Sequence, residues 1–321
     1  MSRWLFSTLM GLVCLSGQVV FAVDMGIVTG REGGTYYKIG ENVSTLVASH
    51  NINLKVLSST GSLDNVGKVY DTPGVQLGIV QSDVLKYISQ VAGTPEQRRI
   101  VSKVKMVFPL YPEEVHVLAT GDIKDFVDLE GKRVAIDGET SGSNLTARLL
   151  FFLSGVKPAD TKPIGGKDAI TALRKGEVDA MIYVAGRPVT LFQQEVSNDD
   201  KFHLLPVREK NILEFYLPKQ IPERSYSWQE EAVDTVAVQA TLMTYDYKGE
   251  NCANVGKLAK IVRENLPWLK VNGHKKWEEV DVDLPLKGWE QYSCVQEALR
   301  GSGEPQGRPG ALPFPLPPIQ K

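Results

Sequence analysis

Cysteine, histidine and net charge are all scarce in this chain. Its 321 residues contain three cysteines and four histidines, and the formal net charge is −2 at pH 7. So weak a charge excludes the strongly basic surface typical of nucleic-acid binding, and we expect no nucleic-acid partner. The four histidines are scattered without ligand spacing, so we expect no metal and no cofactor. They are His50, His116, His203 and His274.

Catalytic motifs are missing as well. No G-x-S-x-G nucleophile elbow occurs. The turn at Gly30–Gly34 does not have the G-x-G-x-x-G spacing, and Gly165–Asp168 lacks the spacing and the Ser/Thr of a phosphate-binding loop. No pair of acids and no Ser–His–Asp set stands out. The sequence therefore favours a binding protein, with an enzyme on the same fold as a weaker alternative.

The apolar run at the N-terminus is short. Arg3 precedes the apolar stretch Leu9–Leu15, and Val20–Ala22 ends in a small residue, which is the pattern of a secretory signal peptide. A membrane anchor is the alternative, but Ser16–Gln18 interrupt the run and it is short for a span of about 20 residues. We therefore predict a signal peptide over residues 1–22 and export to the periplasm.

Cleavage would remove Cys14 and leave two cysteines, Cys252 and Cys294. In an oxidising compartment a disulfide between them is the simplest expectation, with two separate buried thiols as the alternative. The bond would close a loop of about 43 residues, for which the chain-entropy model gives roughly 4 kcal/mol.

Apolar strands alternate with amphipathic helices along the first third of the chain. We expect strands at 24–28, 53–58 and 75–80 and a helix at 35–49. A short helix follows the second strand, and Gln81–Asp83 supplies the N-terminal cap of another, with Asp83 as a cap rather than a ligand contact. Three β-α units in series predict a parallel sheet with crossover helices.

The pattern then restarts. Residues 104–110 and 114–119 are expected to be extended, with Pro112 preventing continuous pairing between them. Strands at 132–136 and 178–184 and helices at 145–153 and 168–175 follow, with Gly155 ending the first helix. Residues 235–244 are expected to return the chain to the first unit as a strand. A helix at 254–266 is expected to stop at Pro267.

These elements predict an α/β fold of two Rossmann-like lobes joined by a hinge. We assign residues 23–110 and 235–300 to lobe I and residues 111–234 to lobe II. Residues 301–321 contain six prolines and are expected to form a flexible tail.

Loops rich in Gly, Ser, Thr, Asn and Gln follow several of the expected strands and precede helices. In open α/β sheets ligands bind at that edge, and helix N-termini offer unpaired N–H groups to an anion. For any single loop, a tight turn or a helix cap is the plainer interpretation. Four such loops in two units favour a ligand cleft between them.

Six segments resemble, in order, motifs of the TAXI family, the extracytoplasmic receptors of TRAP transporters. The resemblance runs from about residue 26 to residue 244. The segments are GREGGTYYKIG at 30–40 (GTGGTGGTYYPIG in the family), STGSLDN at 59–65 (STGGSVEN), LGIVQSD at 77–83 (LGFVQSD), LYPEEVHV at 110–117 (LYPEPLHL), DLEGKRV at 128–134 followed by SGSNLTARLL (DLKGKRV, GSGTEVTARALL), and GEVDAMIYVAGRP at 176–188 (GEIDAFFFVAGYP).

This resemblance implies a type II periplasmic binding protein, a monomer whose lobes close on a ligand and deliver it to a TRAP permease. Family ligands include glutamate, glutamine and dicarboxylates such as 2-oxoglutarate. A sensor that feeds a signalling protein is an alternative to transport. The implied ligand-binding residues are Gly33, Gly34, Thr35, Tyr36, Tyr37, Ser59, Thr60, Gln81 and Ser82 of lobe I, and Ser141, Gly142, Ser143, Asn144, Ala185, Gly186 and Arg187 of lobe II.

The chain departs from the family pattern at charged positions. Arg31 and Glu32 stand where small residues are common, and Arg187 stands where an aromatic residue is common. An arginine can hold a carboxylate bidentately, so either arginine facing the cleft would favour a dianionic ligand. A solvated surface cation is the alternative for each.

Overall fold

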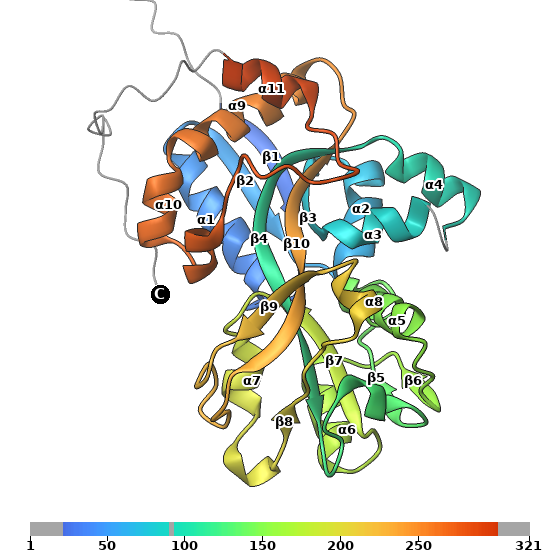
Figure 1. Cartoon of the computed structure of the whole chain (residues 1–321). Helices are drawn as coiled ribbons and strands as arrows, with labels where there is room; N and C mark the ends of the chain where they lie inside the picture. Colours follow the sequence, from blue (N-terminus) through green and yellow to red (C-terminus); the bar gives the residue numbers. More distant parts are fainter. Residues whose placement is uncertain (1–21, 90–92, 301–321) are drawn as a thin grey trace, which may run out of the picture.

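Two α/β lobes share one ten-stranded sheet in the computed structural model, which describes residues 22–89 and 93–300 (Figure 1). The main strand order is β2-β1-β3-β10-β4-β7-β5-β6, with β8 beside β4 and β9 beside β10. The sheet confirms the predicted α/β class. The expected signal peptide up to residue 21 and the proline-rich tail from residue 301 lie outside the described residues.

The first lobe is built from parallel strands with crossover helices, as the apolar periodicity predicted. Strands β1, β2 and β3 lie side by side, with β1 in the centre. Helix α1 buries Ile39, Val43 and Leu46 against them. The elements are β1 (Val23–Val28), α1 (Thr35–Ala48), β2 (Ile52–Leu57), α2 (Ser62–Asp71), β3 (Leu77–Gln81), α3 (Ser82–Tyr87) and α4 (Pro95–Val101).

The second lobe repeats this arrangement. Strand β5 lies parallel to β6 and β7, and α5 ends at Gly155, whose φ of 77° suits a residue without a Cβ. Sequence periodicity did not predict the short strand β6. The elements are η2 (Phe126–Leu129), β5 (Arg133–Ala135), α5 (Gly142–Ser154), β6 (Asp160–Lys162), α6 (Gly166–Arg174), β7 (Ala180–Ala185), α7 (Thr190–Glu195), η3 (Asn198–Asp200), β8 (His203–Leu204), α8 (Lys210–Leu213) and β9 (Leu217–Ile221).

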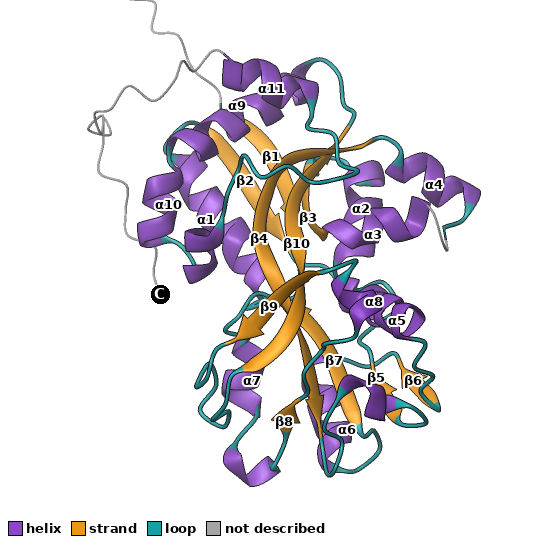
Figure 2. Ribbon diagram, viewed as in Figure 1, coloured by secondary structure: helices purple, strands orange, loops and turns teal. Residues whose placement is uncertain are grey.

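Two long antiparallel strands, β4 (Val104–Ala119) and β10 (Val233–Tyr245), run through both lobes (Figure 2). In the first lobe, β10 pairs with β3; in the second, it pairs with β9, and β4 pairs with β7 from Glu114 onward. The change of partners falls at about residues 112–114 and 237–240. The lobe boundaries given above stay a prediction.

The expectation that Pro112 would break the pairing is wrong. Strand β4 is continuous, and Pro109 and Pro112 stand opposite Thr241 and Gln239 on β10 with a register shift between them. Proline is tolerated at a bulge, and where its missing N–H would face an edge of the strand that is not paired with a neighbouring strand. β4 meets both conditions here, because its pairing with β7 begins only at Glu114.

Pro267 also behaves differently from the expectation. Helix α9 (Glu250–Glu264) ends before it, and Pro267 then lies in the first turn of a further helix, α10 (Leu266–Asn272). A proline in a first turn removes no intrahelical hydrogen bond, so it starts a helix as readily as it ends one. The chain continues through η4 (Lys275–Glu279) to α11 (Ser293–Arg300).

A disulfide joins α9 to α11. Cys252 and Cys294 are bonded with their Cα atoms 5.6 Å apart, and Val295 beside the bond is fully buried. The bond attaches the last described helix to the first lobe. Within the described ranges, no helix is both long and apolar enough to cross a membrane.

We predict that the double variant Cys252→Ser/Cys294→Ser unfolds at lower denaturant concentration. A bond between residues 42 positions apart restricts the unfolded chain by roughly 4 kcal/mol in the entropy model, and we expect a loss of about 2–4 kcal/mol. Urea unfolding followed by circular dichroism measures it.

A reductant should destabilise the wild type and leave the double variant unchanged. Equal stability of the two oxidised proteins would contradict this prediction.

Candidate functional site

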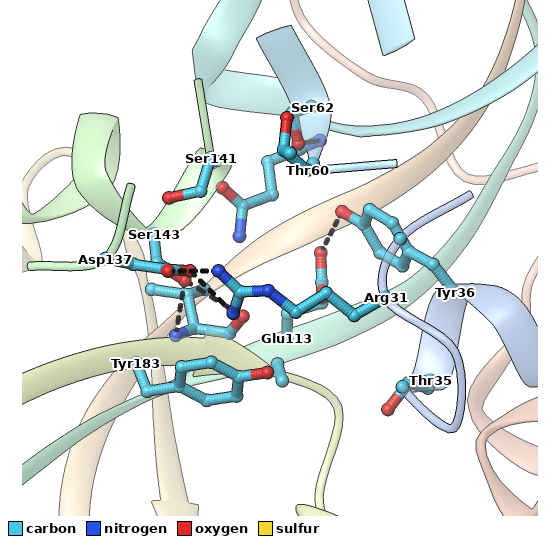
Figure 3. Close-up of a pocket in the computed structure, with 17 residues that line it drawn as sticks. Arg31, Thr35, Tyr36, Thr60, Ser62, Glu113, Asp137, Ser141, Ser143 and Tyr183 are labelled. Atoms are coloured by element: carbon cyan, nitrogen blue, oxygen red, sulfur yellow. Dashed lines mark hydrogen bonds and ion pairs between the residues drawn. The ribbon is translucent and has the colours of Figure 1, made fainter. Parts of the chain in front are cut away.

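A cavity of about 80 Å³ lies between the two lobes, lined by segments from both (Figure 3). The segments are the loop between β1 and α1, the starts of α2 and α5, and residues of β3, β4 and β7. The lining residues are Gly30, Arg31, Gly34, Thr35, Tyr36, Thr60, Gly61, Ser62, Gln81, Glu113, Asp137, Ser141, Gly142, Ser143, Tyr183, Val184 and Ala185.

Three helices begin at this cavity. Helix α1 starts after Gly34 and α2 after Gly61, and neither cap residue uses a side chain to bond the first turn. Helix α5 starts after Ser141, whose hydroxyl accepts a hydrogen bond from the N–H of Asn144. The first N–H groups of a helix lack intrahelical partners and carry a partial positive charge. The cavity can therefore bind a carboxylate by backbone groups.

An ion pair spans the cleft. The Arg31 guanidinium, from the loop before α1, lies 2.6 Å from Oδ1 of Asp137 in the loop after β5 (Figure 3). Burial opposes the charge on Arg31, but the hydrogen bond and the attraction of Asp137 outweigh it and raise the pKa of Arg31. Arg31 therefore keeps its charge at neutral pH. Tyr183 lies beside the pair, and burial raises its pKa to about 12.

A second carboxyl, Glu113 on β4, faces the cavity from the hinge side. Tyr36 donates a hydrogen bond of 2.6 Å from its hydroxyl to Glu113 Oε2 (Figure 3). Burial raises the pKa of Glu113 to about 8. The hydrogen bond from Tyr36 and the charge of Lys276 oppose this rise, and the charges of Glu114 and Asp83 add to it. Glu113 therefore holds its proton at neutral pH.

The lobes touch directly around the cavity. The hydroxyls of Thr60 and Thr140 lie 2.7 Å apart, and the N–H of Leu63 donates to the Thr140 carbonyl. On the opposite rim, the Thr35 hydroxyl donates to the Gly186 carbonyl at 3.3 Å. These contacts join residues of the first lobe to residues of the second, so the structure represents a closed arrangement.

Asp83 belongs to this set of contacts, and the expectation that it caps a helix is wrong. The cap position of α3 is Gln81. The buried Asp83 carboxylate accepts hydrogen bonds from Thr146 at 2.9 Å and Tyr216 at 2.8 Å, both from the other lobe. A side chain with partners 63 and 133 positions away in the sequence could not be assigned from local pattern alone.

Nine of the residues implied by the family motifs line the cavity, and seven do not. Ser59 bonds to backbone groups of its own lobe, and Asn144 donates to the Asp137 carbonyl. The nine are Gly34, Thr35, Tyr36, Thr60, Gln81, Ser141, Gly142, Ser143 and Ala185, and the seven are Gly33, Tyr37, Ser59, Ser82, Asn144, Gly186 and Arg187. Their roles in binding stay a prediction.

The two arginines differ. Arg31 faces the cavity, whereas Arg187 turns to the hinge, where its Nε lies 3.3 Å from Glu114 and its N–H donates to the same carboxylate. Glu114 also accepts two hydrogen bonds from the buried ammonium of Lys276. In this arrangement Arg187 therefore contacts Glu114 at the hinge rather than the cavity between the lobes.

Sequence reasoning did not select seven lining residues. Asp137 follows a predicted strand and opens a polar loop, a signal that could have identified it. Glu113 and Tyr183 lie within strands, where only the fold reveals which side they face. The seven are Gly30, Gly61, Ser62, Glu113, Asp137, Tyr183 and Val184. Among the residues described, no cluster of side chains suited to a metal ion is found.

Comparison with known proteins identifies the fold. A model of the NMT1-like family matches residues 27–288. The periplasmic binding protein BugD superposes with a TM-score of 0.52 at 13% identity, over 86% of this chain and 91% of its own. A protein of Bordetella bronchiseptica RB50 gives 0.50 at 14% identity, over 87% and 89%. The GluR0 ligand-binding core of Nostoc punctiforme, in complex with L-glutamate, gives 0.47 at 15% identity, over 79% and 99%. The fold is that of a two-lobed type II periplasmic binding protein.

We predict that Glu113→Gln flattens the pH dependence of stability. Folded Glu113 binds its proton more tightly than in the unfolded chain, where its pKa is near 4.5. Its contribution is therefore complete below pH 4.5 and is lost as the pH rises toward 8. Glutamine still accepts from Tyr36 but does not titrate.

Between pH 5 and pH 8 the wild type should thus lose more stability than the variant, by a few kcal/mol at most, on the order of the pKa difference. Urea unfolding at each pH measures this. Tyr36, Lys276, Glu114 and Asp83 are present in both proteins, so the difference reports on Glu113. Parallel pH profiles would show that Glu113 is ionised at neutral pH in the folded protein.

Proposed function

This chain belongs to the NMT1-like family, and we propose that it is an exported solute-binding receptor that captures a small carboxylate or amino acid between its lobes. The observation that carries the proposal is the inter-lobe cavity. Three helix N-termini and a cross-cleft ion pair converge on it from both lobes. Reversible binding of a small solute is the function that this arrangement supports best.

Hinge closure is the proposed mode of capture. Strands β4 and β10 are the paired strands common to both lobes, and bending them would move one lobe relative to the other. In the open form, the N-termini of α1 and α2 would receive the ligand. Closure then brings Asp137 and the start of α5 onto it, excludes water and strengthens each hydrogen bond.

The size and charge of the cavity favour a small, carboxylate-bearing solute. A volume of about 80 Å³ is far below the several hundred Å³ of pockets for drug-sized molecules. Arg31 and the helix N-termini offer donors to a carboxylate. Glutamate, glutamine, 2-oxoglutarate and related dicarboxylates are the first candidates, because the resemblance to the TAXI family implies them.

We further propose that the receptor works in the periplasm as a monomer and delivers its ligand to a TRAP permease. The six ordered motifs that resemble the TAXI family support this assignment. BugD, a periplasmic binding protein of the same fold, is consistent with the location. Delivery would be shown if vesicles that contain the permease take up the ligand only when this protein is present.

We predict that at least one small carboxylate or amino acid stabilises the mature protein. A ligand at about 100 times its dissociation constant adds roughly 2.7 kcal/mol, which raises Tm by several degrees. A thermal-shift screen measures this with protein that has been unfolded and refolded to remove any co-purified ligand. The panel is the twenty amino acids, 2-oxoglutarate, succinate, fumarate, malate and glutarate. No shift with any member would contradict the proposed function.

We predict that Thr60→Trp abolishes this stabilisation. Thr60 is exposed, so the larger side chain does not disturb the core, but it stands where the lobes meet at Thr140. An indole there blocks closure. Thr171→Trp, on the exposed face of α6 away from the cavity, is the matched control and should bind as the wild type does. Unchanged binding by Thr60→Trp would place the ligand elsewhere.

A further inference from the structure

The charges that line the cavity do not match a dianion. Among the lining residues described, Arg31 is the one cation, and it is already paired with Asp137. Glu113 adds a second carboxyl to the same wall. Helix N-termini contribute only about half a charge each. A dicarboxylate would bring two negative charges to a cavity whose single full positive charge is neutralised within it.

Asp137 is held rigidly in place. It is 4% exposed, and its φ of 64° lies in the left-handed region. The N–H of Gly138 donates to its Oδ1 at 2.9 Å. At Gly165 a Cβ would lie 1.9 Å from the same oxygen, so only glycine leaves room for this carboxylate. Backbone conformation, a hydrogen bond and a required glycine therefore all fix Asp137 in the cleft.

Arg31 is the adaptable partner. Its side chain is 48% exposed and reaches Asp137 from a loop of the opposite lobe. An arginine side chain has several rotatable bonds, so it can leave the carboxylate while staying within the cleft. The ion pair thus combines a fixed acid with a movable cation.

We propose that Asp137 selects ligands for an amino group, and that the ligand's ammonium takes the place of the Arg31 guanidinium at Asp137 while the freed guanidinium binds the ligand's carboxylate. This inference rests on the proposed function and narrows its ligand class to α-amino acids. One internal ion pair is exchanged for two ion pairs with the ligand, and no charge in the cleft is left without a partner. A dicarboxylate could form an ion pair with Arg31 only if Asp137 were left buried and unpaired, which is costly.

Matched ligands that differ in one amino group test the inference directly. The pairs are L-glutamate and glutarate, L-aspartate and succinate, and L-alanine and propionate, measured by isothermal titration calorimetry with the mature protein. We expect the amino acid of a binding pair to bind at least tenfold more tightly than its partner. Equal or tighter binding of the partner would overturn the inference and leave the receptor function standing. Binding of no member, with no shift in the wider screen, would contradict the receptor function itself.

The variant Asp137→Asn separates selection from support of the fold. Asparagine has the same shape and also tolerates a positive φ. We expect it to weaken binding of the amino acid by at least tenfold, because the ammonium loses its buried partner. Binding of the deamino partner should be unchanged or tighter, because the variant has no carboxylate that this ligand would leave unpaired. Equal loss for both ligands would indicate a merely structural role and overturn the inference.

Two further variants complete the test. Asp200→Asn is the matched control, because Asp200 and Arg174 form an ion pair of the same length and similar exposure on the surface of the second lobe, and it should bind as the wild type does. Arg31→Gln should weaken the binding of both ligands in a matched pair, because each carries the carboxylate that Arg31 binds. If Asp137→Asn does not fold, the matched ligands measured on the wild type and on Arg31→Gln still test the inference. Undiminished binding of the carboxylate ligands by Arg31→Gln would show that Arg31 does not bind the ligand's carboxylate, and would overturn the inference.

Discussion

The antiparallel pairing of β4 with β10 is the constraint on which the rest of the molecule depends. Each strand crosses from one lobe to the other and exchanges neighbours on the way. Each lobe therefore keeps its own parallel strands and helices, while β4 and β10 link the two lobes in one sheet. Pro109 and Pro112 and a register shift interrupt the regular ladder in this stretch. A ladder with fewer hydrogen bonds resists bending less, so the joint is where the protein can move at least cost.

Buried charge reinforces that joint. Glu114, two residues after Pro112, is 1% exposed and accepts hydrogen bonds from the Lys276 ammonium and from the backbone N–H of Arg187. Burying these charges is costly, and the set stabilises only because its members satisfy one another. Its practical effect is geometric: η4, near the end of the described chain, is tied to the hinge strand and to the turn after β7. At Gly186 a Cβ would come within 3.0 Å of both Tyr111 and Lys276, which requires glycine there.

The sequence predicted the fold better than the site, for a physical reason. Apolar periodicity reports which side of an element is buried, and it placed β1, β2, β3, α1 and β7 to within a few residues, but not short elements such as β6 and β9. It does not report which partner a buried polar group finds. Arg31 and Asp137 lie 106 positions apart, and only the topology brings them together. Glu113 lies inside the long strand β4, where the sequence does not say which side it faces. Asp83 stands where a helix cap would stand, and only the fold brings Tyr216 and Thr146 to its carboxylate.

The cross-cleft contacts also bear on how tightly a ligand has to bind. A ligand shifts the balance between open and closed forms only by the difference in its affinity for the two. Thr60, Asp83 and Thr35 bond across the cleft through protein groups alone, so part of the free energy of closure is independent of the ligand. The Arg31–Asp137 pair belongs to the same set, yet it occupies the groups that a zwitterion would use. A ligand with an ammonium and a carboxylate binds both Asp137 and Arg31, so it links the two lobes in place of their ion pair. A ligand that binds only Arg31 breaks the ion pair and leaves Asp137 without a partner. Selectivity and closure therefore follow from the same two side chains.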